Sequence, residues 1–234
     1  MDTTSNDGKE KNRHRYIASW NVRGLCSAGA LKNLEAEAEK YNIEILAIQE
    51  TKLRQEGILE LEKYILFNSN NKESRLFGTG FLIANKLKHI VMKFTPVNEK
   101  IPVNEKVCQM QLRGKERNIN IINVQAPTED KDDEEKSKFY ETVEDIYDLL
   151  PKHDMNIMVG DLNAKVGRED IYKPTVGKFS KHESDIYKPT VGKFSKHESS
   201  NNNGLKLIGL AASKNCCGLI MSTYFEHREI HKIL

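Results

Sequence analysis

The sequence predicts an α/β protein in which sheet layers are covered by helices. Apolar runs of strand length recur along the chain, and segments with the apolar spacing of a helix separate some of them. Short polar clusters follow or interrupt several of these runs, at residues 19–24, 49–51, 78–80 and 160–164. Because a hard divalent cation takes oxygen ligands that converge from separate strand ends, these clusters are the candidate site.

The first half of the chain is predicted to hold one helix among several strands. Residues 31–41 have helical spacing and good helix formers. The apolar run at residues 43–48 is typical of a buried strand, and it delivers Gln49 and Glu50 at its carboxyl end. The predicted strands of this half are residues 16–21, 43–48, 80–84, 90–94, 107–112 and 119–124.

The second half is predicted to hold two helices around one buried strand. Residues 138–150 carry an apolar stripe at helical spacing, and the acidic run before them, at residues 131–136, is expected to be a solvated lead into that helix. Residues 155–159 form a buried strand that ends on Gly160 and Asp161. The last predicted helix covers residues 204–215.

Composition favours one domain and excludes a strongly charged surface overall. The chain has 36 basic and 34 acidic residues, so its formal charge is only +2. No global field draws it onto a polyanion, and any affinity for nucleic acid must come from a local face. We expect a disordered polar tail at residues 1–15 and a single domain at residues 16–234.

The cysteines and the apolar segments indicate an intracellular protein, nuclear or cytoplasmic. Cys26, Cys108, Cys216 and Cys217 show no CxxC spacing, which fits a reducing compartment. The N-terminal tail has no apolar core of the kind a secretory signal needs, and no run approaches the ~18 apolar residues of a membrane span. The sequence gives no sign of oligomeric state.

Two internal duplications interrupt the order of elements. Residues 170–184 are repeated letter for letter at 185–199, and residues 96–100 recur at 102–106. Two copies cannot stack into a solenoid, which needs about three units or more. We expect the duplicated loop at 170–199 to be exposed and dispensable, because doubling a loop costs only about 0.6 kcal/mol in closure entropy.

The polar residues at strand ends have two interpretations when each is taken alone. Glu50 follows an apolar strand, where a lone carboxylate is costly unless it is paired or binds a cation, but it could also lie in solvent. Asp161 and Asn163 could be site residues, or they could serve a turn or a helix N-cap.

The order of the motifs resolves this ambiguity through a family resemblance. The stretches are SWNVRG at 19–24, LAIQET at 46–51, GTGFLIA at 78–84, NVQAPTED at 123–130 and VGDLNAKVG at 159–167. Together they resemble the endonuclease/exonuclease/phosphatase superfamily. The wording is most similar to the craniofacial development protein 2-like group and to the endonuclease domains of non-LTR retrotransposons.

The resemblance implies a role for each of five residues. Glu50 would be the main ligand of magnesium, or of manganese, with Asn21 beside it. Asp161 would orient or deprotonate the attacking water, and Asn163 would donate a hydrogen bond to the scissile phosphate. Gln125 stands where the family often has Tyr or His, and it can still donate a hydrogen bond to phosphate.

The resemblance also implies a four-layer α/β sandwich of the DNase-I type, here expected to lack its C-terminal strands. Family members close with a catalytic Asp-His pair, and this sequence ends at Leu234 without one. Two hypotheses follow. The first is a magnesium-dependent phosphodiesterase, a DNA-nicking endonuclease of retrotransposon descent with impaired activity. The second is a non-catalytic remnant that binds nucleic acid or protein. DNA, RNA and phosphoinositide remain alternative substrates, because the loops carry no base-reading or stacking signature.

Overall fold

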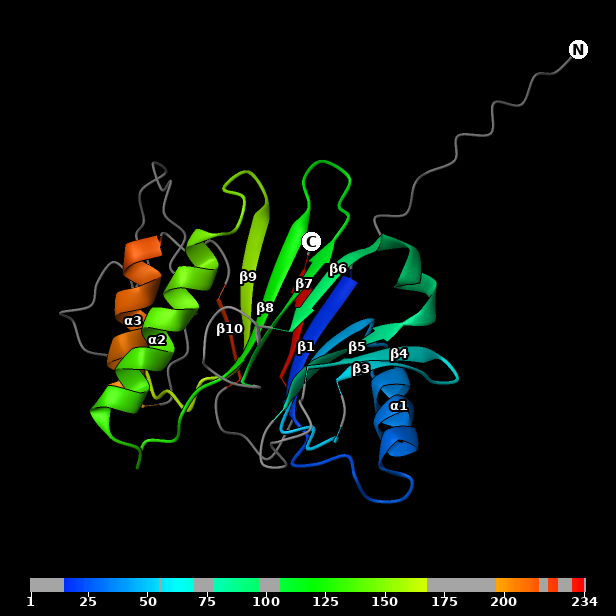
Figure 1. Cartoon of the computed structure of the whole chain (residues 1–234), viewed down its shortest axis with the longest axis horizontal. Helices are drawn as coiled ribbons and strands as arrows, with labels where there is room; N and C mark the ends of the chain where they lie inside the picture. The colour runs from blue at the N-terminus through cyan, green and yellow to red at the C-terminus, as the bar shows by residue number, and fades with distance from the viewer. Residues whose placement is uncertain are drawn as a thin grey trace, which may run out of the picture.

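Two β-sheets lie against each other in this protein, and helices cover their outer faces (Figure 1). The computed structural model describes residues 15–54, 56–69, 78–96, 106–167, 197–214, 219–222 and 229–233. The predicted tail, except Arg15, and the duplicated loop up to residue 196 lie outside these residues, as do residues 97–105 of the shorter repeat and the adjacent Cys216 and Cys217.

The first sheet has six strands among the described residues, in the order β11-β1-β2-β5-β4-β3. β1 and β2 run parallel, and every other neighbouring pair in this sheet is antiparallel. The strands are β1 (Arg15–Asn21), β2 (Ile45–Gln49), β3 (Gly57–Glu60), β4 (Tyr64–Asn68), β5 (Thr79–Ala84) and β11 (Glu229–Ile233).

The second sheet has five strands in the described part of the chain, in the order β10-β9-β8-β7-β6. β9 runs parallel to both of its neighbours, so the carboxyl ends of three strands meet at one edge. The strands are β6 (Val91–Pro96), β7 (Val107–Leu112), β8 (Ile119–Gln125), β9 (Met155–Asp161) and β10 (Leu219–Ser222). The helices are α1 (Ala30–Lys40), the 3₁₀ helix η1 (Asn85–Ile90), α2 (Asp133–Asp148) and α3 (Asn202–Lys214).

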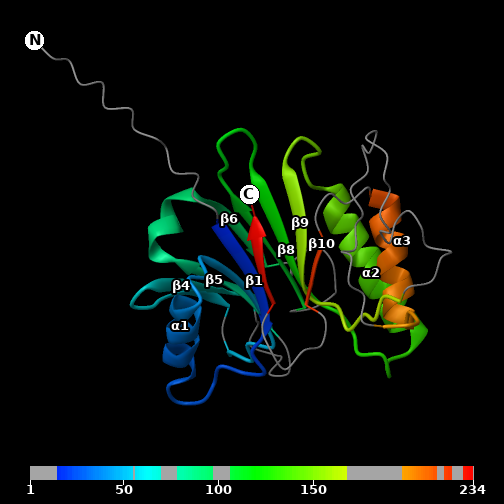
Figure 2. The same ribbon diagram turned by 180° about the vertical axis from the view of Figure 1, so that it is seen from behind.

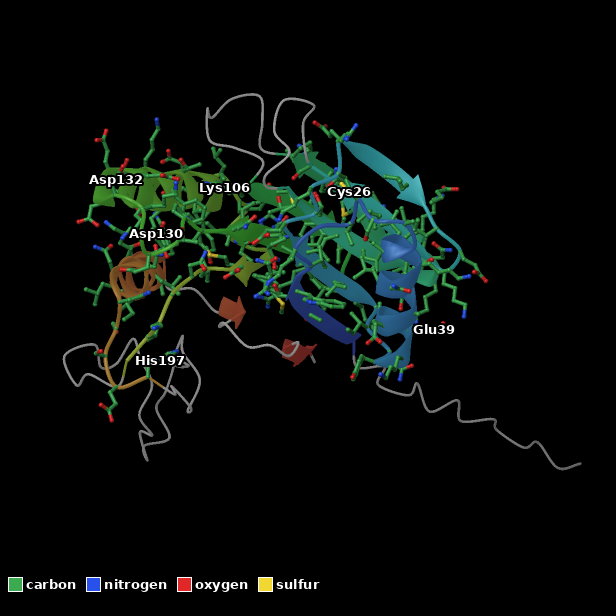
Figure 3. All side chains as sticks on the ribbon, turned by 90° about the horizontal axis from the view of Figure 1, so that it is seen from below. Cys26, Glu39, Lys106, Asp130, Asp132 and His197 are labelled. Atoms are coloured by element: carbon green, nitrogen blue, oxygen red, sulfur yellow. The ribbon has the colours of Figure 1, made fainter. Side chains whose placement is uncertain are left out.

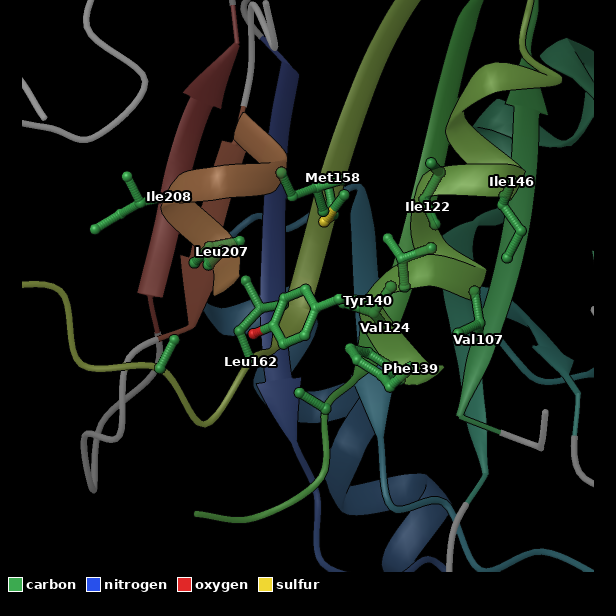
Figure 4. Packing of buried hydrophobic residues seen from close by; sticks show 14 of the residues in the cluster. Val107, Ile122, Val124, Phe139, Tyr140, Ile146, Met158, Leu162, Leu207 and Ile208 are labelled. Carbon is green, nitrogen blue, oxygen red and sulfur yellow. The ribbon is translucent and has the colours of Figure 1, made fainter. Parts of the chain in front are cut away.

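Three apolar cores separate four layers. Between the sheets, residues such as Phe81 of β5 pack with Met110 of β7 and Ile121 of β8. α1 covers the outer face of the first sheet, while α2 and α3 cover that of the second, at opposite sides of the molecule in Figures 1 and 2. Figure 4 shows the last of these cores, where Phe139 and Leu207 belong to the cluster formed with Met158. The predicted four-layer α/β sandwich is therefore confirmed.

Strand β2 shows why the predicted strands read as continuous apolar runs. Ile45 and Ala47 face the second sheet, whereas Leu46 and Ile48 face α1. Because successive side chains point to opposite faces, a strand covered on both sides has apolar residues at every position. All five residues of β2 are buried.

The expected lead into α2 is part of the helix, which corrects the prediction for residues 131–136. Asp132 is the N-cap and accepts a hydrogen bond from the Glu135 backbone nitrogen at 2.7 Å. Acidic residues in the first turn are stabilised by the positive end of the helix dipole. Apolar spacing identified only the buried portion of this helix, because its first turn is charged and largely solvated.

Four strands were not among the sequence predictions. β3 is mostly exposed, so it has no inward apolar face to detect. β4 is buried throughout but only five residues long, a length at which an apolar run is ambiguous. β10 and β11 follow α3 and pair with β9 and β1. None of the described helices is long and apolar enough to cross a membrane.

Candidate active site

Three predicted site residues meet where strand ends of the two sheets converge. Asn21 is the last residue of β1, and Glu50 directly follows β2, the parallel neighbour of β1. Asp161 is the last residue of β9 in the facing sheet. Parallel neighbours bring their carboxyl ends to one edge, and the packing of the sheets then brings the two edges together.

One amide nitrogen joins the two carboxylates. Asn21 Nδ2 donates to Glu50 Oε1 at 2.7 Å and to Asp161 Oδ2 at 2.9 Å. Asn21 Oδ1 accepts a hydrogen bond from the Arg23 backbone nitrogen at 3.1 Å, which fixes the amide plane. The amide of Asn21 therefore links the sheets and holds both carboxylates at one place.

The backbone at the site is strained in two places. Glu50 has φ 55° and Asn163 has φ 46°, both in the left-handed region that side chains with a Cβ seldom adopt. Such conformations cost about 1–3 kcal/mol and cluster at functional sites. Gly160 has φ 141°, and a Cβ there would lie 1.9 Å from the Val124 carbonyl oxygen, so only glycine allows β9 to approach β8 this closely.

The carboxyl group of Asp161 is held in an environment that resists its ionisation. Asp161 is only 7% exposed, and its burial is the main cause that raises its pKa; the nearby charge of Glu50 acts in the same direction. Hydrogen bonds from the Asn21 amide and the Asn163 backbone nitrogen oppose this shift, as does the charge of Arg23. The net direction is upward, which makes Asp161 a better proton acceptor than an ordinary aspartate.

The remaining two predicted residues lie beside Asp161. Asn163 donates its backbone N–H to Asp161 Oδ1 at 3.2 Å and its side-chain Nδ2 to the Ala126 carbonyl oxygen at 2.9 Å. Gln125 ends β8 directly opposite Asp161 in the register, and it is buried with no hydrogen-bond partner for Oε1. The structure thus brings all five predicted residues to one location.

The oxygen donors of this site fit magnesium or manganese. Glu50, Asp161 and the carbonyl oxygen of Asn21 offer only oxygen atoms, the ligands that hard cations prefer. Within the described ranges, no group of three or more His, Cys, Asp or Glu side chains could hold a metal ion. Magnesium needs only one or two carboxylates when water and phosphate complete its coordination.

A lysine that sequence reasoning did not single out pairs with Glu50. Lys52 Nζ lies 3.1 Å from Glu50 Oε2, and the two side chains are 36% and 24% exposed. The signal was present in the spacing, because side chains two positions apart fall on the same side of an extended segment, but the left-handed turns at Glu50 and Lys52 were not predictable from it. Positive charge beside Glu50 favours its ionised form.

The cavity next to this pair is basic. Its volume is about 360 Å³, and no acidic residue lines it. Figure 3 marks its place by Cys26, whose thiol donates to the Lys52 carbonyl oxygen at 2.9 Å. Its lining residues are Arg23, Gly24, Cys26, Ser27, Lys52 and Arg54.

A second group of residues that the sequence analysis did not identify locks the sheets together below the site. Gln49 Nε2 donates to Asn123 Oδ1 at 2.7 Å. Asn123 Nδ2 donates to the carbonyl oxygens of Ile48 at 2.9 Å and Gly80 at 2.8 Å. Gln49 and Asn123 are fully buried, so each of these bonds is made away from water. The bonds fix the alignment of β2 and β8, and through it the spacing of Glu50 and Gln125.

Comparison with known proteins decides the family. The model of the endonuclease/exonuclease/phosphatase family matches residues 18–204, which include all five site residues. The chain belongs to the endonuclease/exonuclease/phosphatase family. The motif order described above is thus a property of the family, and the strand-end cluster lies within the matched region.

Two curated relatives of this family member are mammalian. The chain is 30% identical over 155 residues to craniofacial development protein 2 of Bos taurus, covering 66% of this chain and 25% of that protein. It is 28% identical over 173 residues to the protein of the same name from Tragulus javanicus, covering 73% and 29%. The chain therefore spans between a quarter and three tenths of the length of these relatives.

Solved structures of similar fold support the family assignment. The endonuclease domain of TRAS1, a telomere-specific non-LTR retrotransposon, matches with a TM-score of 0.51 at 15% identity, covering 86% of this chain and 73% of that one. The AP endonuclease LMAP from Leishmania major matches with a TM-score of 0.55 at 16% identity, covering 86% and 67%. At these identities the likeness concerns the fold.

Proposed function

We propose that this chain is a magnesium-dependent phosphodiesterase that nicks DNA, with manganese as an alternative metal and with descent from a retrotransposon endonuclease. The observation that carries the proposal is the amide of Asn21, which donates from one nitrogen to both Glu50 and Asp161. A pair of carboxylates held at facing strand ends, on oxygen ligands alone, suits phosphoryl transfer assisted by a hard cation.

Each residue of the site has a distinct task in this proposal. Glu50 and the carbonyl oxygen of Asn21 hold the metal, which when bound neutralises charge on the scissile phosphate. Asp161 orients the attacking water and accepts its proton as the new oxygen–phosphorus bond forms. Asn163 has a second amide N–H, beyond the one given to Ala126, that donates to a phosphate oxygen. Gln125 supplies a further donor from β8.

The basic cavity supports a substrate with more than one phosphate. Arg23, Lys52 and Arg54 line it, and Arg23 follows Asn21 by only two residues. A phosphate next to the scissile one along a nucleic acid strand would reach this cavity, whereas an isolated phosphate at the catalytic residues would not. Arginine and lysine contacts to phosphate are the usual source of affinity for nucleic acid.

We further propose that a polypeptide of these 234 residues is a weak catalyst. The resemblance assigns the closing Asp-His pair to catalysis, and the printed sequence holds no such pair. Loss of one general acid or base costs about 10²–10⁴-fold in rate. The same polypeptide can still bind nucleic acid through the basic cavity, which is the non-catalytic alternative.

Nicking of supercoiled plasmid tests the proposal. We expect slow nicking that requires magnesium and falls at least 100-fold in Glu50→Gln, the order expected for loss of a main electrostatic contact. Glu62→Gln is the matched control, because Glu62 is exposed and outside the site, and it should nick like the wild type. Nicking that survives Glu50→Gln, or that persists in EDTA, would refute the proposal. Plasmid binding without any nicking would favour the binding module instead.

A further inference from the structure

The N-terminus of α3 contacts the backbone of Asn163, although some forty positions of sequence separate them. Asn201 Nδ2 donates to the Asn163 carbonyl oxygen at 3.1 Å. Asn203 Nδ2 lies 3.4 Å from the same oxygen and donates to the Pro127 carbonyl oxygen at 2.9 Å. Two amides of α3 therefore converge on one carbonyl group of the candidate active site.

Asn201 also holds the chain that follows Asn163. Its Oδ1 accepts hydrogen bonds from the backbone nitrogens of Lys165 and Gly204, both at 2.8 Å. Its own backbone nitrogen donates to the Lys165 carbonyl oxygen at 3.0 Å. A Cβ on Gly204 would lie 2.0 Å from that same carbonyl oxygen, so glycine is needed for α3 to approach this closely.

Asn203 is anchored on several sides. It is fully buried, and its carbonyl oxygen accepts from the Tyr140 hydroxyl at 3.0 Å. Its side-chain Oδ1 has no hydrogen-bond partner, which costs stability in a buried amide. An apolar side chain would fill a core without that cost, so the donation from Nδ2 to the loops after β8 and β9 is what the asparagine contributes.

These contacts bear on a strained residue. Asn163 has φ 46°, and its backbone nitrogen and side chain donate to Asp161 and Ala126. With its carbonyl oxygen held as well, rotation of the Asn163 backbone is restricted on both sides of the Cα atom. The direction of its side chain follows from that restriction.

We propose that Asn201 and Asn203 are positioning residues that hold Asn163 in the left-handed conformation from which its amide reaches the scissile phosphate. The role of Asn163 in this inference rests on the proposed function. The clamp itself is a structural statement, because it concerns only contacts between α3 and the loop after β9.

The substitution Asn201→Asp tests the clamp selectively. Aspartate keeps Oδ1 for the Lys165 and Gly204 nitrogens and remains a good N-cap, but it cannot donate to the Asn163 carbonyl. Asn202→Asp is the matched control, because it adds the same charge at the next position. Asn202 Nδ2 donates to Asp133 Oδ1 at 2.9 Å instead. Asn203→Asp removes the second donor and provides an independent variant.

Two measurements are needed on the same set of proteins. Amide hydrogen exchange of Asn163 should be faster in Asn201→Asp and in Asn203→Asp than in the wild type, and unchanged in Asn202→Asp. In plasmid nicking, kcat should fall at least about tenfold in the first two variants with KM changed by less than about twofold, because a 1 Å misplacement costs up to ~10²-fold.

The outcomes separate the clamp from the proposed function. Equal exchange at Asn163 in Asn201→Asp and the wild type would overturn the clamp, as would equal losses in Asn201→Asp and Asn202→Asp. If the wild-type chain nicks nothing, the proposed function fails, and the exchange rates of Asn163 still decide whether α3 holds it. If exchange accelerates while kcat is unchanged, the positioning role is wrong.

Discussion

Glu50 and Asp161 accept hydrogen bonds from the same nitrogen, yet they lie in different environments. The Glu50 side chain is 24% exposed and has an ammonium partner in Lys52. Asp161 is 7% exposed, has no such partner among the printed contacts, and has its pKa raised mainly by burial. Two carboxylates in distinct environments can take distinct tasks, one toward a cation and one toward a proton.

The difference comes from the layer that supplies each residue. Glu50 leaves β2 in a left-handed turn toward the basic cavity, where solvent reaches it. Asp161 is the end of a strand flanked on both sides by β8 and β10, so its surroundings are protein. The edge of one sheet therefore offers a solvated carboxylate, and the interior of the other offers a desolvated one.

Removing the carboxylate of Asp161 should have the largest effect on this comparison. Asp161→Asn keeps the size of the side chain and loses the proton acceptor, so we expect plasmid nicking to fall by about 10²–10⁴-fold. Asp145→Asn, at an exposed position of α2, should nick like the wild type. Nicking by Asp161→Asn within a few-fold of the wild type would remove Asp161 from the proton-transfer role.

Removing the shared donor should change the pH dependence of the reaction. Asn21→Ala deletes a hydrogen bond that lowers the pKa of Asp161, so that pKa should rise further. A general base works when deprotonated, and activity is lost as pH falls through its pKa. The acid limb of the nicking rate should therefore lie at higher pH in Asn21→Ala than in the wild type. An acid limb that stays in place or moves to lower pH would contradict the assignment.

Removing one copy of the duplicated loop should have the smallest effect. The base of the loop is closed by bonds on the Asp161 side of the site. Lys165 and Asn201 pair through their backbones at 3.0 Å, and the Gly167 nitrogen donates to Ser200 Oγ at 2.9 Å. Deleting residues 170–184 leaves the identical second copy in front of Ser200. The melting temperature and the nicking rate should be unchanged, and a fall of several degrees would show that the loop packs on the domain.

The sequence was sufficient to find residues at strand ends. Glu50 and Asp161 each follow an apolar run, and burial of the strand on both faces makes that run visible. The roles of Asn163 and Gln125 came only from the resemblance, because an asparagine in a turn and a glutamine ending a strand have common structural explanations.

Contacts between distant segments could not be predicted in the same way. Asn201 and Asn203 act on Asn163 from the far side of a long insertion, and nothing in local spacing relates them. The bond between Gln49 and Asn123 depends on how one sheet lies on the other. Strand β11 pairs with the start of the chain, a contact set by topology. An Asn-rich segment immediately before Gly204 was the one visible signal, typical of a helix N-cap.

Magnesium binding, measured by isothermal titration calorimetry, tests the division of labour between the two carboxylates most directly. The wild type should bind weakly, Glu50→Gln should lose most of the binding, and Asp161→Asn should keep most of it, because only Glu50 is assigned as the main ligand. Manganese, titrated in the same way, should give the same order. Equal binding by Glu50→Gln and the wild type, or a greater loss in Asp161→Asn than in Glu50→Gln, would contradict the account.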